Sequence, residues 1–135
     1  MSVHTVDFPL RYTDTDMTGH INNAVYSVMY MTGRGTFLRE ANLWAPGGKF
    51  VPVIVRMEID YIRELNFPGT VRIETAIRKL GGKSIHVGQR IVNNGELASR
   101  AVGVMVMFDT VNRVSTEIPP DWRAKLEGYL APDFA

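Results

Sequence analysis

Cysteine is absent from all 135 residues of the sequence. This absence excludes a disulfide framework, a thiol nucleophile and a thiolate metal site, and it fits a reducing compartment. The formal net charge is only +1, so there is no electrostatic reason to expect nucleic acid or an anionic membrane as a partner. No segment approaches the roughly 18 apolar residues of a membrane span, and residues 1–12 lack the basic-then-apolar order of a signal peptide. We therefore expect a cytoplasmic protein.

Several catalytic patterns are also missing. There is no G-x-S-x-G motif, which argues against an α/β-hydrolase. His4, His20 and His86 are far apart in the chain and none belongs to an H-E-x-x-H motif, so we do not expect a metal hydrolase. The run Gly81 to Ser84 lacks the first glycine of a phosphate-binding loop at the required offset.

Residues 12–40 organise the rest of the chain, because a polar loop there runs into a long apolar segment. From Ala24 onward the apolar residues fall on every side of a helical wheel, which predicts a helix that is buried on most sides. Asn22 or Asn23 can cap its start, and Asn42 is a plausible end. We expect this long helix to be the centre of the fold.

Two glycines lie inside this predicted helix. Gly33 and Gly35 each cost about 0.8–1 kcal/mol relative to alanine in a helix interior. We interpret them as points of close backbone approach, either to a strand or to a second copy of the helix. The alternative is that the helix bends or breaks there.

Five segments have the composition and patterning of strands: residues 3–12, 51–63, 70–80, 84–92 and 97–108. The joints between the last three are short and rich in glycine and asparagine, which predicts hairpins and antiparallel neighbours. Residues 118–130 favour a short amphipathic helix. The sequence predicts one α+β domain over residues 1–135, in which a curled antiparallel sheet wraps around the central helix.

A curled sheet still has edges, and an exposed edge strand is usually blunted or paired. Residues 101–108 are apolar on both faces apart from the glycine. We interpret this strand as an interface and expect a dimer at least.

The run from Asp14 to Tyr26 has the form D-x-D-x-x-G-H-x-N-N-x-x-Y. Together with the order of elements, it resembles the hotdog-fold acyl thioesterases, most closely the 4-hydroxybenzoyl-CoA thioesterases and the acyl-carrier-protein thioesterases. The resemblance covers nearly the whole chain. It implies a sheet of five to six strands around the helix, thioester hydrolysis without a metal or other cofactor, and sites between the subunits of a homodimer or homotetramer.

Asp16 is the first candidate catalytic residue. Hydrolysis of a thioester needs a carboxylate that attacks or activates water, and donors where the carbonyl oxygen becomes negative. Asp16 lies just before the predicted helix, whose first turn offers free N–H groups and the positive end of the dipole. The resemblance assigns Asp16 as nucleophile or general base. The alternative is that Asp16 only hydrogen-bonds the loop backbone.

The resemblance to the acyl-carrier-protein enzymes adds His20 and Glu64. His20 has the spacing of the family's histidine, and the run from Ile59 to Glu64 resembles L-E-Y-R-R-E, which places Glu64 at the family's glutamate. Thr18 stands where the family has asparagine. His20 can orient a water or hold Asp16, or it can cap the helix or pack against a tyrosine. Glu64 can equally be a solvated residue at a strand end.

The remaining candidates are substrate-binding residues and caps: Thr18, Gly19, Asn22, Asn23, Tyr26, Lys83 and Ser84. Asn22 and Asn23 are interpreted as helix caps, with direct catalysis by Asn23 as the alternative. Tyr26 can fill the core or line an acyl pocket. Lys83 and Ser84 resemble a turn that holds coenzyme A phosphates in the 4-hydroxybenzoyl type, with Arg78 and Lys79 able to assist, or they are solvated.

We therefore expect hydrolysis of an acyl-CoA thioester to the free acid and CoA. The coenzyme is part of the substrate, and acyl carrier protein is the other carrier to consider. Two alternatives stay open: a non-catalytic acyl-CoA binding module, and a hydratase that acts on enoyl thioesters with the same fold.

Overall fold

The computed structural model describes residues 3–135, and its elements follow the predicted order. The strands are β1 (His4–Pro9), β2 (Phe50–Tyr61), β3 (Thr70–Leu80), β4 (Ser84–Asn93), β5 (Glu96–Asp109) and the two-residue β6 (Val114–Ser115). The helices are the 3-10 turn η1 (Tyr12–Asp14), α1 (Asn23–Glu40) and α2 (Pro120–Glu127). All five predicted strands and both predicted helices are therefore present. No helix within residues 3–135 has the length and apolar character needed to cross a membrane.

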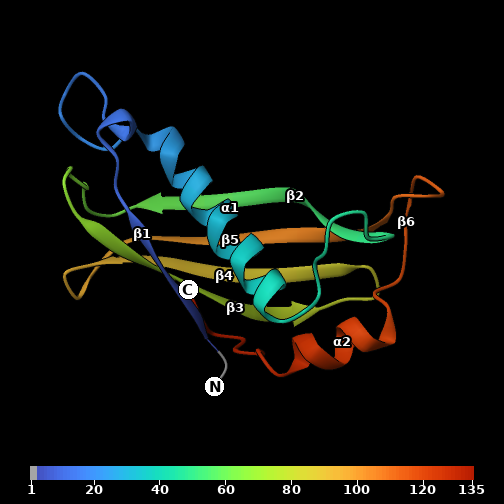
Figure 1. The fold of residues 1–135 in the computed structure, drawn as a ribbon. Coiled ribbons are helices and arrows are strands. Elements are labelled where there is room, and N and C mark those ends of the chain that lie inside the picture. The colour runs from blue at the N-terminus through green and yellow to red at the C-terminus, as the bar shows by residue number, and fades with distance from the viewer. Residues whose placement is uncertain (1–2) are drawn as a thin grey trace.

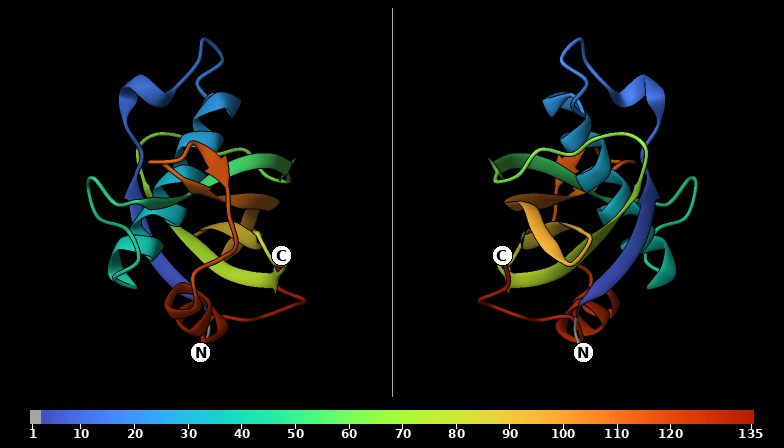
Figure 2. Two further views of the ribbon diagram at one scale, coloured as in Figure 1. Left: turned by 90° about the vertical axis from the view of Figure 1, so that its right-hand side faces the viewer. Right: turned by 90° about the vertical axis from the view of Figure 1, so that its left-hand side faces the viewer.

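The strands form one antiparallel sheet in the order β1-β3-β4-β5-β2, and β6 pairs with the end of β5. The sheet curves around α1, which lies against its concave face (Figures 1 and 2). The tight turn between β4 and β5 uses Asn94 and Gly95, both with positive φ, as the hairpin signal predicted. The α+β class with a central helix is thus confirmed.

The edge position expected for β5 was wrong. This strand lies between β4 and β2, so it is an interior strand and not a sheet edge. Apolar alternation shows which faces of a strand are covered but not which strands are its neighbours. The edges are β1 and β2, and β2 carries the exposed apolar side chains Val53, Ile54 and Val55.

Helix α1 has 18 residues and is therefore about 27 Å long, which is shorter than the long helix expected. Asn22 is its N-cap, since the Asn22 side chain accepts from the Ala24 N–H at 2.9 Å, and Asn42 beyond its end has φ of 58°. The prediction that it is buried on most sides was wrong for the single chain. Val28 and Met31 are 38% and 57% exposed, because one curled sheet covers only one side of a helix.

The buried side of α1 approaches the sheet most closely at Gly33. A Cβ atom at Gly33 would lie 2.7 Å from Ile73 Cγ2, 3.0 Å from Gln89 Nε2 and 3.2 Å from Thr75 Oγ1. A Cβ at Gly35 would meet no heavy atom within 4 Å. Close approach to strands therefore explains Gly33, and the same explanation does not apply to Gly35 within one chain.

The two glycines give a matched pair of variants. We expect Gly33→Ala to destabilise the fold by about 1–3 kcal/mol, since the added methyl group forces the β-branched Ile73 or the helix to shift. Gly35→Ala should be neutral or stabilising by up to about 1 kcal/mol, because it only improves helix propensity. Urea unfolding of the three proteins measures both effects. Equal midpoints for the two variants would contradict the packing argument.

Candidate active site

A pocket of about 310 Å³ lies where the loop before α1, the first turn of α1 and the end of β2 meet. In Figure 1 this loop and the arrowhead of β2 are on the same side of the molecule. The lining residues are Asp16, His20, Ile21, Asn23, Tyr26, Tyr61, Ile62, Arg63 and Glu64. The structure thus brings all four predicted catalytic residues, and Tyr26, to one pocket.

The loop is fixed at its start by a buried carboxylate. Asp14 is 2% exposed and accepts hydrogen bonds from the Arg11 backbone at 2.9 Å and from Arg11 Nη2 at 2.7 Å. The hydrogen bond from the Arg11 side chain is the main cause that holds the pKa of Asp14 below its usual value, against the opposite effect of burial. The Asp14 carbonyl accepts from the Asn22 N–H at 2.8 Å, so this clamp also sets where the helix begins.

Asp16 is held by the residue two positions along the chain. Its Oδ1 accepts from the Thr18 N–H at 2.9 Å and from the Thr18 hydroxyl at 2.5 Å. These two hydrogen bonds, the hydroxyl first, hold the pKa of Asp16 below its ordinary value. The carboxyl group is therefore ionised at neutral pH, which is the form required for attack or for general-base catalysis.

Thr18, which replaces the family's asparagine, also connects Asp16 to His20. The Thr18 hydroxyl lies 3.3 Å from His20 Nδ1, and His20 Nε2 lies 2.5 Å from Glu64 Oε2. The four side chains form one continuous polar chain along the wall of the pocket. The arrangement orients the imidazole between a hydroxyl and a carboxylate.

Backbone pairing explains why Glu64 is close to His20. The Ile21 N–H donates to the Leu65 carbonyl at 2.8 Å, and His20 forms an isolated bridge with Asn66. Gly19 turns the loop with φ of 86°, a conformation that glycine adopts without strain. The segment after β2 therefore lies beside the loop before α1.

One backbone N–H group at the start of α1 remains available to donate a hydrogen bond. The N–H groups of Asn22, Ala24 and Val25 donate to Asp14 O, Asn22 Oδ1 and Asn22 O, respectively. The Asn23 N–H has no acceptor among residues 3–135. Of the four amides at residues 22–25, at the positive end of the helix dipole, only this one lacks an acceptor within residues 3–135.

Tyr26 and Tyr61 form the apolar wall. Tyr26 is 3% exposed, and its ring packs edge-on against Tyr61 with centroids 4.9 Å apart. Burial is the main cause that raises the pKa of Tyr26, so its hydroxyl stays protonated. Tyr26 thus both belongs to the core and lines the pocket.

Lys83 and Ser84 are not at this pocket. They lie at the turn between β3 and β4, at the opposite end of the sheet (Figure 1), and β3 has 11 residues, a length of about 36 Å. Within one chain, Lys83 and Ser84 are therefore too far from Asp16 to contact a small molecule that is bound there. Sequence reasoning missed four lining residues of the pocket: Ile21, Tyr61, Ile62 and Arg63. The only sequence signal for the last three was that they directly precede Glu64.

No group of three or more His, Asp or Glu side chains within residues 3–135 is placed to hold a metal ion.

A family model of the thioesterase-like superfamily matches residues 10–126. The chain belongs to this superfamily. The uncharacterized protein YsmA of Bacillus subtilis is 22% identical over 109 residues, which cover 78% of this chain and 74% of YsmA. A predicted thioesterase from Bacillus stearothermophilus is 28% identical, with a TM-score of 0.87 and coverage of 96% of this chain and 98% of that one.

A second similar structure is the DHNA-CoA thioesterase from Staphylococcus aureus. It is 17% identical, with a TM-score of 0.82 and coverage of 94% of this chain and 90% of the other. At this identity the likeness shows the fold alone. Membership of the thioesterase-like superfamily confirms the resemblance found in the run from Asp14 to Tyr26.

The Thr18 hydroxyl gives a test of the electrostatics in this thioesterase-like site. We expect Thr18→Ala to raise the pKa of Asp16, because the carboxylate loses its main stabilising hydrogen bond. Asp16 would then become protonated at a higher pH than in the original protein. A pH titration of the Asp16 carboxyl carbon by NMR measures the change, and Thr18→Ser, which keeps the hydroxyl, is the control. Identical titration curves for Thr18→Ala and the original protein would contradict the assignment.

Proposed function

We propose that the protein hydrolyses an acyl-CoA thioester to the free acid and CoA. The observation that supports this most directly is that one pocket is lined both by the ionised Asp16 and by Asn23, whose N–H has no acceptor within residues 3–135. A carboxylate and a hydrogen-bond donor at a helix start are the two groups that thioester hydrolysis needs. Membership of the thioesterase-like superfamily agrees with this chemistry.

In the proposed reaction, Asp16 acts as general base or as nucleophile. As a base it takes a proton from water while the water oxygen attacks the thioester carbonyl carbon. The carbonyl oxygen becomes negative, and the Asn23 N–H with the helix dipole stabilises that charge. The carbon–sulfur bond then breaks, and CoA leaves as a thiolate that takes up a proton. As a nucleophile, Asp16 forms an acyl anhydride that water hydrolyses in a second step.

His20 positions these groups in the proposal. It lies between Thr18 and Glu64, and Thr18 holds the Asp16 carboxylate through its Oδ1 atom. The imidazole is therefore fixed at the mouth of the pocket, where it can orient the attacking water. Glu64 acts through His20, as its carboxylate lies against His20 Nε2.

Coenzyme A is proposed as the carrier. The fold neighbour from Staphylococcus aureus is a DHNA-CoA thioesterase, which supports a CoA thioester here. We also propose a homodimer or homotetramer. Val28 and Met31 on α1 and Val55 on the edge strand β2 are exposed apolar side chains that a second copy would cover.

Replacement of the carboxylate tests the function. We expect Asp16→Asn to reduce turnover by at least about a hundredfold, since it removes the base or nucleophile. The fold should be unaffected because Asp16 is exposed. The measurement is release of free thiol from a panel of acyl-CoAs that differ in the acyl group.

Asp7→Asn is the matched control, because Asp7 is an exposed aspartate on β1 and outside the pocket. Its turnover should equal that of the original protein. Near-full activity of Asp16→Asn would rule out the mechanism. Binding of acyl-CoA with no thiol release by the original protein would instead indicate a binding module, and hydration of an enoyl-CoA without thiol release would indicate a hydratase.

A further inference from the structure

A second cavity, of about 300 Å³, lies between the second half of α1, the loop that follows it and the start of β2. Its lining residues are Met31, Arg34, Gly35, Leu38, Trp44, Val51, Pro52, Ile54 and Met105. Arg34 is the only charged residue among them, and none of them lines the Asp16 pocket. We call it the Arg34 cavity.

The size and lining of the Arg34 cavity are those of a small-molecule site. Such sites have volumes from about 300 Å³, mostly apolar walls and a few fixed polar groups. Leu38 and Met105 are buried and form the floor, whereas Met31, Trp44 and Ile54 are exposed at the rim. A ligand can therefore enter from solvent and bury an apolar body against the floor.

The Arg34 side chain is held in place by buried groups. Its Nη1 donates to Gln89 Oε1 at 3.1 Å and lies 3.6 Å from Met57 Sδ. Gln89 is fully buried and is itself bonded to the Tyr30 carbonyl and the Thr75 hydroxyl. The guanidinium is thus positioned before any ligand arrives, which lowers the entropy cost of binding.

The charge of Arg34 has no counter-ion. Arg34 forms no ion pair with any residue in the range 3–135, and burial lowers the pKa of its guanidinium. Only Nη1 has a hydrogen-bond partner within that range, yet no nitrogen of Arg34 is both unpartnered and sealed from solvent. The remaining donors therefore open into the cavity that Arg34 lines. A half-buried charge of this kind is stabilised by an anion.

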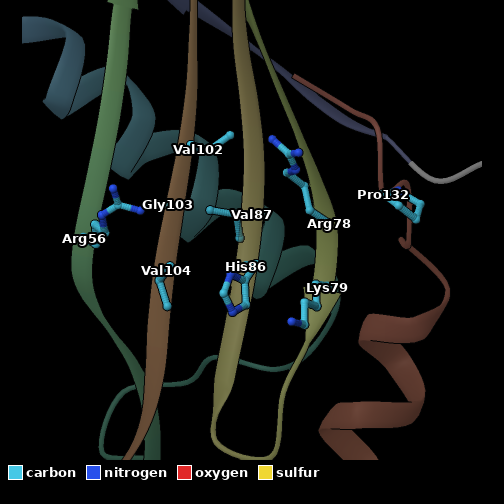
Figure 3. A pocket seen from close by; sticks show the side chains of 9 residues that line it. All are labelled: Arg56, Arg78, Lys79, His86, Val87, Val102, Gly103, Val104 and Pro132. Carbon is cyan, nitrogen blue, oxygen red and sulfur yellow. The ribbon is translucent and has the colours of Figure 1, made fainter.

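The cations on the other face of the sheet differ from Arg34. They line a cavity of about 360 Å³, and Figure 3 shows their side chains in front of the strands with α1 behind. Arg56 there contacts Glu58 at 2.9 Å, and Lys79 is exposed. Water already stabilises such charges, so they need no ligand. Arg34 is less solvated and has apolar neighbours.

We propose that the Arg34 cavity binds an organic carboxylate with an apolar body, such as a fatty acid or an aromatic acid. A carboxylate accepts paired hydrogen bonds from a guanidinium, and one cation matches one negative charge. The apolar body would contact Leu38 and Met105, where water is displaced from apolar surface.

Two sources can supply such an acid. One is the acid that thioester hydrolysis would release, which rests on the proposed function. The other is an acid formed by a different reaction, which does not. Ile54 in the Arg34 cavity and Tyr61 in the Asp16 pocket are about 23 Å apart along β2. Within one chain the two cavities are therefore separate sites, and binding at Arg34 can be measured without hydrolysis.

Calorimetric titration with straight-chain carboxylates tests the site. We expect octanoate to bind at least about tenfold more tightly than butanoate, because it buries four more methylene groups. Octan-1-ol, which has the same chain and no charge, should bind at least about tenfold more weakly than octanoate. Equal affinity for octanoate and octan-1-ol would overturn the proposal.

A carboxylate placed beside Arg34 tests the role of the charge. Met31 is exposed and lies three residues before Arg34 on α1, so the Met31→Glu side chain can pair with the guanidinium. We expect Met31→Glu to weaken octanoate binding at least about tenfold relative to Met31→Gln, which has nearly the same size and no charge. Equal affinities of these two variants would contradict the proposal.

Removal of the guanidinium is the complementary test. Arg34→Gln should lose octanoate binding by about tenfold or more. Arg39→Gln is its control, because Arg39 is exposed on the same helix and outside the cavity. If Arg34→Gln unfolds, the Met31 pair still decides. No octanoate binding by the original protein would overturn the proposal, including the case in which a second copy covers the cavity.

The source is identified with the acid from the thiol-release assay. If that acid binds to the original protein and Met31→Glu loses the binding, the ligand is the product of the proposed reaction. If octanoate binds but the released acid does not, or no acyl-CoA is hydrolysed, the ligand comes from another reaction. Either result supports the carboxylate site, and failure of hydrolysis alone does not affect it.

Discussion

The close packing of α1 on the sheet at Gly33 is the constraint on which the rest of the structure depends. Where the helix touches the sheet, Gln89 donates to the Tyr30 carbonyl at 3.0 Å and to the Thr75 hydroxyl at 2.9 Å. Arg34 donates to the Gln89 side-chain oxygen at 3.1 Å, and burial lowers the pKa of this guanidinium. Buried polar groups fit only one arrangement of partners, so these bonds fix the position of the helix along its axis as well as its distance from the sheet.

The fixed position of α1 on the sheet determines where the candidate site lies. The Tyr30 hydroxyl donates to Ser99 Oγ at 2.6 Å, and Ser99 donates to the Asp60 carbonyl at 2.8 Å. Tyr30 thereby ties the helix to the end of β2 at a point about two turns from the start of α1. Since Tyr61 and the first turn of α1 both line the pocket, the polar bonds beneath the helix fix how these two parts of the pocket are placed relative to each other. A helix free to slide would change where Asn23 lies relative to Asp16 in the pocket.

The sequence predicted which residues meet in the pocket better than it predicted the order of the strands. Asn22 as a cap follows from a local signal, because a cap depends on residues close in the chain, whereas the grouping of Asp16, His20 and Glu64 was implied by the family resemblance. The order of strands follows from neither, and the interior position of β5 could not be predicted because alternation records only burial. The Arg11 to Asp14 clamp was missed, since a buried aspartate in a polar loop has no distinct sequence pattern. The register shifts in β2, between Ile54 and Arg56, and in β3, between Ile77 and Lys79, were also missed, because these shifts have no distinct sequence pattern either.

The two faces of the sheet differ in the polar and charged side chains that they can carry. On the concave face, large apolar side chains such as Ile73 and Ile91 are fully buried under α1, so polar groups are admitted only where they have partners, as at Gln89. On the other face, Arg56, Arg78 and Lys79 line a cavity together, and neither Arg78 nor Lys79 forms an ion pair with a side chain among residues 3–135. An unpaired charge costs little on a solvated surface and a great deal in a core. A cluster of cations is therefore compatible with this fold only on the face of the sheet that does not contact α1. There the cations do not weaken the packing that holds α1 in place.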